Sequence, residues 1–262
     1  MPRKALRGLV PSLLLVALPT ATSAVAQPTS SSTYSPFPER PLAPPKSRPI
    51  KVALLISQNT TLIDIAGPLQ TFGQVRARAP AGFVAGPDNL EVQPDGTYFP
   101  FQTYTVSETR TPIHAGATAQ AHLTITPDYT FEDAPEPDIV VVGAQSGKDE
   151  NYLGYLRRMA NDGKLVLSVC TGVGQIAQAG LLDGRYATSH HDFISQFQQR
   201  YPKIHWVADK AYVHSAPMIY TAGGETSGFE LALHIVELYF GRDAAVATAR
   251  SMEYRGPAWQ KI

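Results

Sequence analysis

The sequence predicts an α/β protein in three layers, with helices covering both faces of a mostly parallel sheet. Continuous apolar runs, typical of strands buried on both faces, occupy residues 51–57, 138–143 and 164–169. One helical pattern, at residues 151–161, lies between the second and third of these runs, and another, at 227–240, follows the third. Because alternating strands and helices are joined by right-handed crossovers, the strands are expected to run parallel.

The remaining elements are shorter. A loop carrying Asp64 is expected after the first strand, and then a helix that begins near Gly67 and has Pro68 in its first turn. Residues 83–122 place aromatic residues and Thr in short alternations between Gly and Pro, which predicts strands and hairpins. The pattern also predicts a helix at 172–179 and short strands at 212–213 and 218–221.

Composition excludes several classes of function. The 262 residues are 44% hydrophobic, which is enough for a sizeable core, and the 22 basic side chains balance the 22 acidic ones. The chain therefore lacks the basic surplus that would indicate binding to nucleic acid or to an anionic membrane. Neither a GxGxxG motif nor a P-loop is present, so nothing supports nucleotide binding, and no cofactor is predicted.

The first 26 residues have the pattern of an export signal. Basic residues open the chain, residues 9–18 are apolar, and Ala24-Val25-Ala26 is a small-x-small cleavage site. The apolar run is too short to span a bilayer as a mature helix. We therefore expect a signal peptide at 1–26 and a periplasmic or secreted protein, with an uncleaved membrane anchor as the alternative.

The boundaries of the folded domain follow from composition. Residues 27–49 are rich in Ser, Thr and Pro, which predicts a disordered linker between the signal and the domain. The domain is expected to cover residues 50–254, with 255–262 as a C-terminal tail.

The most informative residue is Cys170, the only cysteine of the chain. Ser168-Val169-Cys170-Thr171-Gly172 is a small-x-nucleophile-x-small pattern at the end of a buried strand, typical of a nucleophile elbow. Such a turn places the sulfur at a helix N-terminus and the N–H of Thr171 where an oxyanion forms. It predicts a positive φ at Cys170, an accessible sulfur and a thiol pKa below the free value. The alternative is a buried, unreactive cysteine.

The stretch Val169 to His190 resembles the DJ-1/PfpI superfamily; its sequence is Val-Cys-Thr-Gly-Val-Gly-Gln-Ile-Ala-Gln-Ala-Gly-Leu-Leu-Asp-Gly-Arg-Tyr-Ala-Thr-Ser-His. Residues 62–72, with Asp-Ile-Ala-Gly-Pro, 126–142 and 221–250 resemble further segments of that superfamily. The resemblance implies the flavodoxin-like, class I glutamine amidotransferase-like fold. The closest branches are isonitrile hydratase and the ligand-binding half of AraC-type regulators.

The resemblance also implies roles for individual residues. Asp64 with the Cys170-Thr171 pair is most similar to isonitrile hydratase, where the carboxyl would act as acid and base; the alternative is an Asp that organises the turn or caps the helix. Gly143 and Ala144 stand where the family commonly has Gly-Gly, so their turn is expected to supply the second oxyanion-hole N–H. Thr171 replaces the His of the peptidase-like branch, and the glutaminase His and Glu are not evident, which disfavours both activities.

The histidines divide into three groups. His190 matches the family position near the cysteine, where it would stabilise the thiolate or hold a substrate; a structural histidine is the equal alternative. Which of His190 and His191 faces the sulfur stays open. His234 lies on the inward face of the last long helix and is expected in the core. The other histidines show no metal-ligand spacing, so no metal is predicted.

Three functions remain. The first is an exported enzyme in which Cys170 attacks a small electrophile and Asp64 moves protons, with isonitrile hydratase-like chemistry. The second is an exported ligand-binding or thiol-sensing module, and the third a glyoxalase-type enzyme. The expected partner is a small molecule. Nucleic acid is not expected, nor is membrane contact after signal cleavage, and a homodimer is possible.

Overall fold

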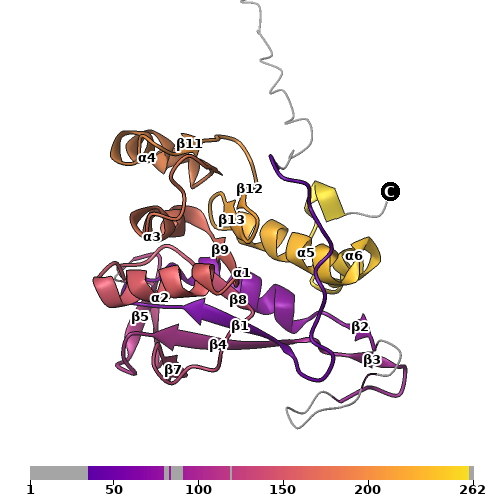
Figure 1. The fold of residues 1–262 in the computed structure, drawn as a ribbon. Helices are drawn as coiled ribbons and strands as arrows, with labels where there is room; N and C mark the ends of the chain where they lie inside the picture. The colour runs from indigo at the N-terminus through magenta and orange to yellow at the C-terminus, as the bar shows by residue number, and fades with distance from the viewer. Residues whose placement is uncertain (1–34, 80–82, 84–90, 119, 260–262) are drawn as a thin grey trace, which may run out of the picture.

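A seven-stranded sheet with helices on both faces organises the part of the chain that the computed structural model describes, residues 35–79, 83, 91–118 and 120–259 (Figure 1). Every neighbouring pair is parallel except the antiparallel pair at one edge. The predicted α/β class is therefore confirmed. In spatial order the strands are β12 (Tyr212–Ala216), β13 (Ile219–Ala222), β9 (Leu165–Ser168), β8 (Ile139–Val142), β1 (Ile50–Leu55), β4 (Phe101–Ser107) and β7 (Tyr129–Thr130).

The core lies on both faces of the three central strands. In β1, Val52 and Leu54 face one helical layer, while Ala53 and Leu55 face the other. Burying each such aliphatic side chain contributes about 1.5–3 kcal/mol, which explains why these strands read as unbroken apolar runs. The first layer holds α1 (Leu62–Gly73), α5 (Ser227–Phe240) and α6 (Arg242–Ser251); the second holds α2 (Glu150–Asn161) and α3 (Val173–Gln178), with α4 (Ile194–Arg200) beyond it.

Helix α1 begins earlier than the sequence indicates. It starts at Leu62, so Asp64 lies in the first turn of the helix and not in a loop, and Pro68 lies inside the helix. The N–H of Thr61 donates to the carbonyl of Ala144 at 2.8 Å, which attaches the start of the helix to the turn after β8. Pro68 cannot donate a helical hydrogen bond and its ring crowds the preceding turn, yet the helix continues through it to Gly73.

Small peripheral strands surround the sheet. The stretch from 83 to 122, part of which lies outside the described residues, contributes both hairpin strands and the full-length strand β4, in line with the expected strands and hairpins. The two-stranded pairs are β2 (Ala77–Arg78) with β3 (Thr97–Tyr98), β5 (Ile113–Gly116) with β6 (His122–Ile125), and β10 (Tyr186–Ala187) with β11 (His205–Trp206).

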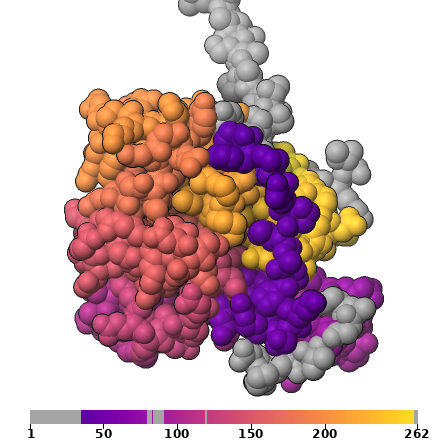
Figure 2. Space-filling model, in the orientation of Figure 1, coloured from indigo at the N-terminus to yellow at the C-terminus, as the bar shows by residue number. Residues whose placement is uncertain are grey.

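Residues 35–49, the described part of the predicted linker, lie against the domain. Figure 2 shows this segment running along the surface over the C-terminal third of the chain. Leu42 donates its N–H to a carbonyl of α5 at 2.8 Å, and Glu39 contacts the imidazole of the buried His234 at 2.9 Å. The prediction of a disordered linker is wrong for these residues, because a few well-placed polar contacts hold a segment that lacks an apolar run.

The ends of the chain are described only in part. The predicted signal peptide lies outside the described residues. No helix in the described part of the chain is long and apolar enough to cross a membrane. The described part of the predicted tail forms a short 3-10 helix, η3 (Pro257–Trp259), whose indole is buried and donates to Glu230.

Candidate active site

The chain turns sharply at Cys170, directly after β9. Cys170 has φ = 59°, the positive value that a nucleophile elbow predicts. A Cβ at Gly172 would overlap the carbonyl oxygen of Val142, so the turn needs glycine there. The N–H of Cys170 donates to the carbonyl of Gly223 at 2.7 Å, which attaches the elbow to the loop after β13. A positive φ costs a non-glycine residue about 1–2 kcal/mol, and the surrounding hydrogen bonds hold the strained backbone in place.

The sulfur of Cys170 is almost enclosed, since the residue is only 7% exposed. Backbone N–H groups of Thr171 and Glu225 donate to it. Burial and the negative charge of Asp64 nevertheless raise the pKa of the thiol to about 11. The expected accessible sulfur with a lowered pKa is therefore wrong: desolvation and neighbouring carboxylates outweigh the two N–H groups and the helix N-terminus.

Asp64 is fully buried beside the cysteine. Its Oδ2 accepts the N–H of Ala144 at 2.8 Å, while Oδ1 has no hydrogen-bond partner. Burial raises the pKa of this carboxyl to about 6, against the lowering effect of the Ala144 bond, and the charge of Glu225 adds to the rise. A side chain bonded to Ala144 does not cap its own helix. Its raised pKa lies closer to neutral pH than that of an ordinary carboxyl.

The turn after β8 is arranged around Asp64. A Cβ at Gly143 would lie 2.7 Å from the Cβ of Asp64, so glycine is required there, whereas Ala144 is accommodated. Because the N–H of Ala144 donates to Asp64, it is not free to stabilise an oxyanion. The Ala144 N–H expected in the oxyanion hole is thus bonded to Asp64, while the N–H groups of Thr171 and Glu225 point at the sulfur.

His190 stands behind the loop that follows β13. Its ring lies against Gly224, where a Cβ would come within 2.5 Å of Cδ2. Its Nδ1 accepts the N–H of Asp192 at 3.3 Å, and the ring stacks on His191. The preceding residue, Ser189, donates its hydroxyl to the carbonyl of Cys170 at 3.0 Å. The described interactions of His190 are therefore with its neighbours, one residue away from Glu225, rather than with the sulfur.

Glu225 is a residue that the sequence analysis did not select. It lies in the loop between β13 and α5 with φ = 24°, directs its N–H at the sulfur, and raises the pKa of both Asp64 and Cys170 through its charge. The available signal was the preceding Gly223-Gly224 pair at the end of a strand, since ligands bind at the carboxyl ends of parallel strands.

A cysteine on a strand-to-helix elbow, with a buried carboxyl and backbone N–H groups near it at the carboxyl edge of a parallel sheet, defines the class of α/β proteins that carry a thiol at a nucleophile elbow. The model of the DJ-1/PfpI family matches residues 50–238. The chain belongs to this family.

Curated relatives fall into two kinds. An isonitrile hydratase of Pseudomonas putida is 32% identical over 145 residues, which cover 52% of this chain and 60% of that protein. The HTH-type transcriptional regulator GbdR of Pseudomonas aeruginosa is 26% identical over 232 residues, covering 85% of this chain and 54% of the regulator. The chain thus spans less than two thirds of the length of each.

Solved structures share the fold. A ThiJ/PfpI family protein from Pseudomonas syringae has a TM-score of 0.60 at 23% identity, covering 81% of this chain and 79% of that one. A transcriptional regulator protein, described as putative, from Vibrio parahaemolyticus has a TM-score of 0.62 at 18% identity, covering 78% of this chain and all of that one. At these identities the likeness establishes the architecture alone.

Proposed function

We propose that this protein is an exported cysteine-dependent enzyme that adds water to a small electrophilic molecule, with an isonitrile as the substrate and an N-substituted formamide as the product. The observation that carries the proposal is the buried carboxyl of Asp64, whose Oδ1 has no hydrogen-bond partner and whose charge raises the pKa of the Cys170 thiol. The similarity to isonitrile hydratase supports the same chemistry.

The protonation states suit this reaction. The carbon of an isonitrile must gain both a proton and a nucleophile, and a thiol with a raised pKa carries both at neutral pH. The proton passes from sulfur to Asp64 and on to the isonitrile carbon, while the sulfur bonds to that carbon and forms a thioimidate. The N–H groups of Thr171 and Glu225 stabilise the sulfur as negative charge develops on it.

Water completes the cycle. Asp64 takes a proton from a water molecule, whose oxygen adds to the thioimidate carbon, and the nitrogen is protonated. The carbon–sulfur bond then breaks, the sulfur recovers its proton, and the formamide leaves. Atoms balance as one isonitrile plus one water, and these steps need no metal or organic cofactor.

A second candidate is an exported ligand-binding or thiol-sensing module. The near-enclosed sulfur favours it, as does the similarity to a transcriptional regulator over most of the chain. A glyoxalase-type enzyme is less favoured, because His190 is held by Asp192 and Gly224.

Turnover separates these candidates. Purified protein is incubated with alkyl and aryl isonitriles, and formamide formation is followed by chromatography. The enzyme proposal expects turnover that Cys170→Ser abolishes. Ligand-induced thermal stabilisation without any product would instead support the binding module. N-terminal sequencing of the protein from its native host tests export, which predicts a mature chain that begins near Gln27.

A further inference from the structure

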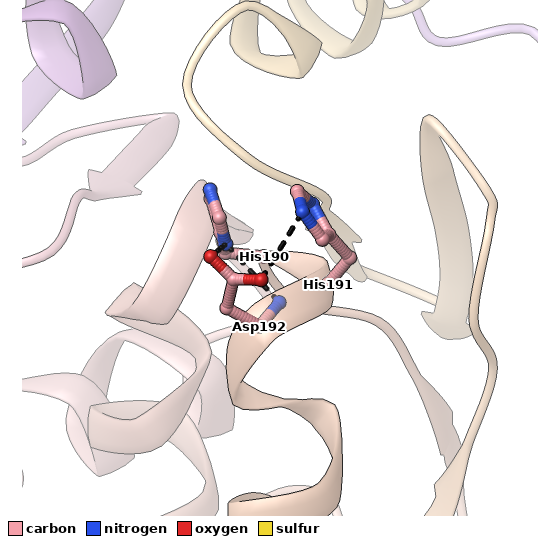
Figure 3. A group of neighbouring side chains, drawn as sticks. All are labelled: His190, His191 and Asp192. Atoms are coloured by element: carbon pink, nitrogen blue, oxygen red, sulfur yellow. Dashed lines mark hydrogen bonds and ion pairs between the residues drawn. The ribbon is translucent and has the colours of Figure 1, made fainter.

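Three consecutive side chains beside the candidate active site converge at one point. Figure 3 shows the rings of His190 and His191 side by side, with the carboxylate of Asp192 below them. One carboxylate oxygen lies 3.7 Å from Nδ1 of His190, and the other lies 3.2 Å from Nε2 of His191. One ligand atom from each residue lies within 4.8 Å of the others.

The backbone explains why neighbours in sequence point the same way. His190 has φ = −53° and ψ = 132°, outside the helical region, and precedes the 3-10 helix η2 (His191–Phe193). As the N-cap of that helix, its ring folds back over the turn and accepts the N–H of Asp192. The three side chains therefore share one side of the turn, whereas consecutive residues of a regular helix diverge.

The first ligand is held in place by its surroundings. The His190 side chain is 23% exposed and is confined by Gly224 and by the ring of Phe193. His191 stacks on it with ring centroids 4.5 Å apart and an interplanar angle of 22°. His191 and Asp192 are themselves well exposed, so they can adjust by a few tenths of an ångström and leave coordination positions open to water.

These separations suit a tetrahedral ion. Bonds of about 2.0–2.2 Å place the ligand atoms of a tetrahedral zinc site about 3.3–3.6 Å apart. The two nitrogen–oxygen separations bracket that range, and a small rotation of the exposed carboxylate would bring one of its oxygens to both imidazoles. The ion would take the Nδ1 lone pair of His190 in place of the long 3.3 Å hydrogen bond from the Asp192 N–H. Two imidazoles and one carboxylate are a ligand set that favours zinc, nickel or copper over magnesium or calcium, which prefer oxygen ligands alone.

We propose that His190, His191 and Asp192 form a binding site for one divalent transition-metal ion of the zinc class, completed by water. The site does not depend on the proposed hydratase activity. The ion would fix the turn 190–192 against Gly224, the neighbour of the residue whose N–H faces the Cys170 sulfur. The sequence did not indicate this site, because three adjacent residues match none of the usual ligand spacings.

Calorimetric titration of the metal-free, untagged protein with ZnCl₂ tests the proposal. We expect one Zn²⁺ per chain and binding at least about tenfold weaker in His191→Ala, since even the loss of a supporting residue typically costs 10- to 100-fold. Asp192→Asn, which keeps the backbone N–H that His190 caps, should also bind more weakly. Co²⁺ should bind without the near-ultraviolet band of a thiolate ligand.

Two matched variants make the test decisive. His205→Ala removes another exposed histidine, and Cys170→Ser removes the thiol; both should bind Zn²⁺ like the unaltered protein. The absence of saturable Zn²⁺ binding by the unaltered protein up to millimolar concentration would overturn the site. So would equal affinity in His191→Ala, or binding that disappears only in Cys170→Ser.

Discussion

Two partly or fully buried aspartates near opposite ends of β8 have pKa values that are shifted in opposite directions. Asp138 precedes the strand and accepts two bonds from the guanidinium of Arg48, at 2.6 and 2.8 Å, and one from the N–H of Lys51. Burial raises the pKa of Asp138, but these donors outweigh it and leave the pKa lowered. Beyond the other end, Asp64 has one donor and an unpartnered oxygen, and its pKa is raised to about 6.

The comparison teaches what distinguishes a structural carboxylate from a functional one. Both are shielded from water, so burial alone does not separate them. Asp138 receives every donor it needs and joins the segment before β1 to the sheet. Asp64 is left short of donors next to a thiol, so it exchanges a proton near neutral pH. These donors favour a structural role for Asp138 at the amino edge of the sheet, whereas the proposed function places the chemistry at the carboxyl edge.

The largest expected effect is on activity, which should depend on Asp64 and not on Asp138. Asp64→Asn should lower isonitrile turnover by about 10²–10⁴-fold, because an amide does not carry the proton. Asp138→Asn should leave turnover within about twofold, since its partners lie at the far edge of the sheet. Steady-state formamide production measures both. Equal losses in the two variants would remove the functional distinction.

The next effect concerns the thiol itself. With a pKa of about 11 against an ordinary 9.0, Cys170 should react with iodoacetamide at neutral pH about 100-fold more slowly than a free thiol. Asp64→Asn should accelerate the reaction, because it removes a negative charge that raises the thiol pKa. Asp138→Asn serves as the control. A midpoint at or below the free-cysteine value in the unaltered protein would contradict the structure.

Asp64 and Asp138 should affect the pH dependence of the free energy of unfolding with opposite signs. The folded-state pKa of Asp64 is raised, so its contribution favours folding in acid and is lost as pH rises through about 6; at pH 7 it opposes folding. Asp64→Asn should therefore raise the free energy of unfolding by about 2 kcal/mol at pH 7, and by less at pH 5.

Asp138 has a lowered pKa, so its contribution is present at neutral pH and is lost as pH falls through the folded-state value. Asp138→Asn should cost about 1 kcal/mol at pH 7, a modest value because Arg48 is partly exposed. Urea unfolding at several pH values measures both variants. A destabilised Asp64→Asn protein would indicate that the carboxylate is structural after all.

The smallest effect tests how far a surface charge reaches into the site. Glu225→Gln should lower the pKa of both Asp64 and Cys170, since its charge raises each. Because Glu225 is exposed and screened, alkylation of Cys170 should accelerate only about two- to threefold. Added salt should produce a similar acceleration in the unaltered protein and none in the variant.

The sequence predicted the fold well where periodicity and burial agree. The apolar runs at β1, β8 and β9 were predicted as strands buried on both faces and form such strands, and α5 has the predicted bounds. The start of α1 could not be predicted, because it depends on a bond between Thr61 and Ala144, 83 residues apart by their numbers. Residues 35–49 were misjudged for the same reason: their order comes from single contacts with distant residues.

The site was predicted in part. The small neighbours of Cys170 identified the elbow, and the resemblance pointed to Asp64. The direction of the thiol pKa was wrong, because burial depends on what packs above the sulfur. The sequence did not predict the role of Glu225, because its position depends on the conformation of the loop after β13. It did not predict the turn at His190 either, because that turn depends on the N-cap conformation of this residue.

The positive φ of Cys170 has an evolutionary consequence. Glycine adopts this conformation without strain, so selection for stability alone would favour glycine at position 170 and discard the thiol. A cysteine persists in such a backbone only while its sulfur is under selection. Among descendants of this protein, glycine at that position would mark lineages in which the thiol has lost its use.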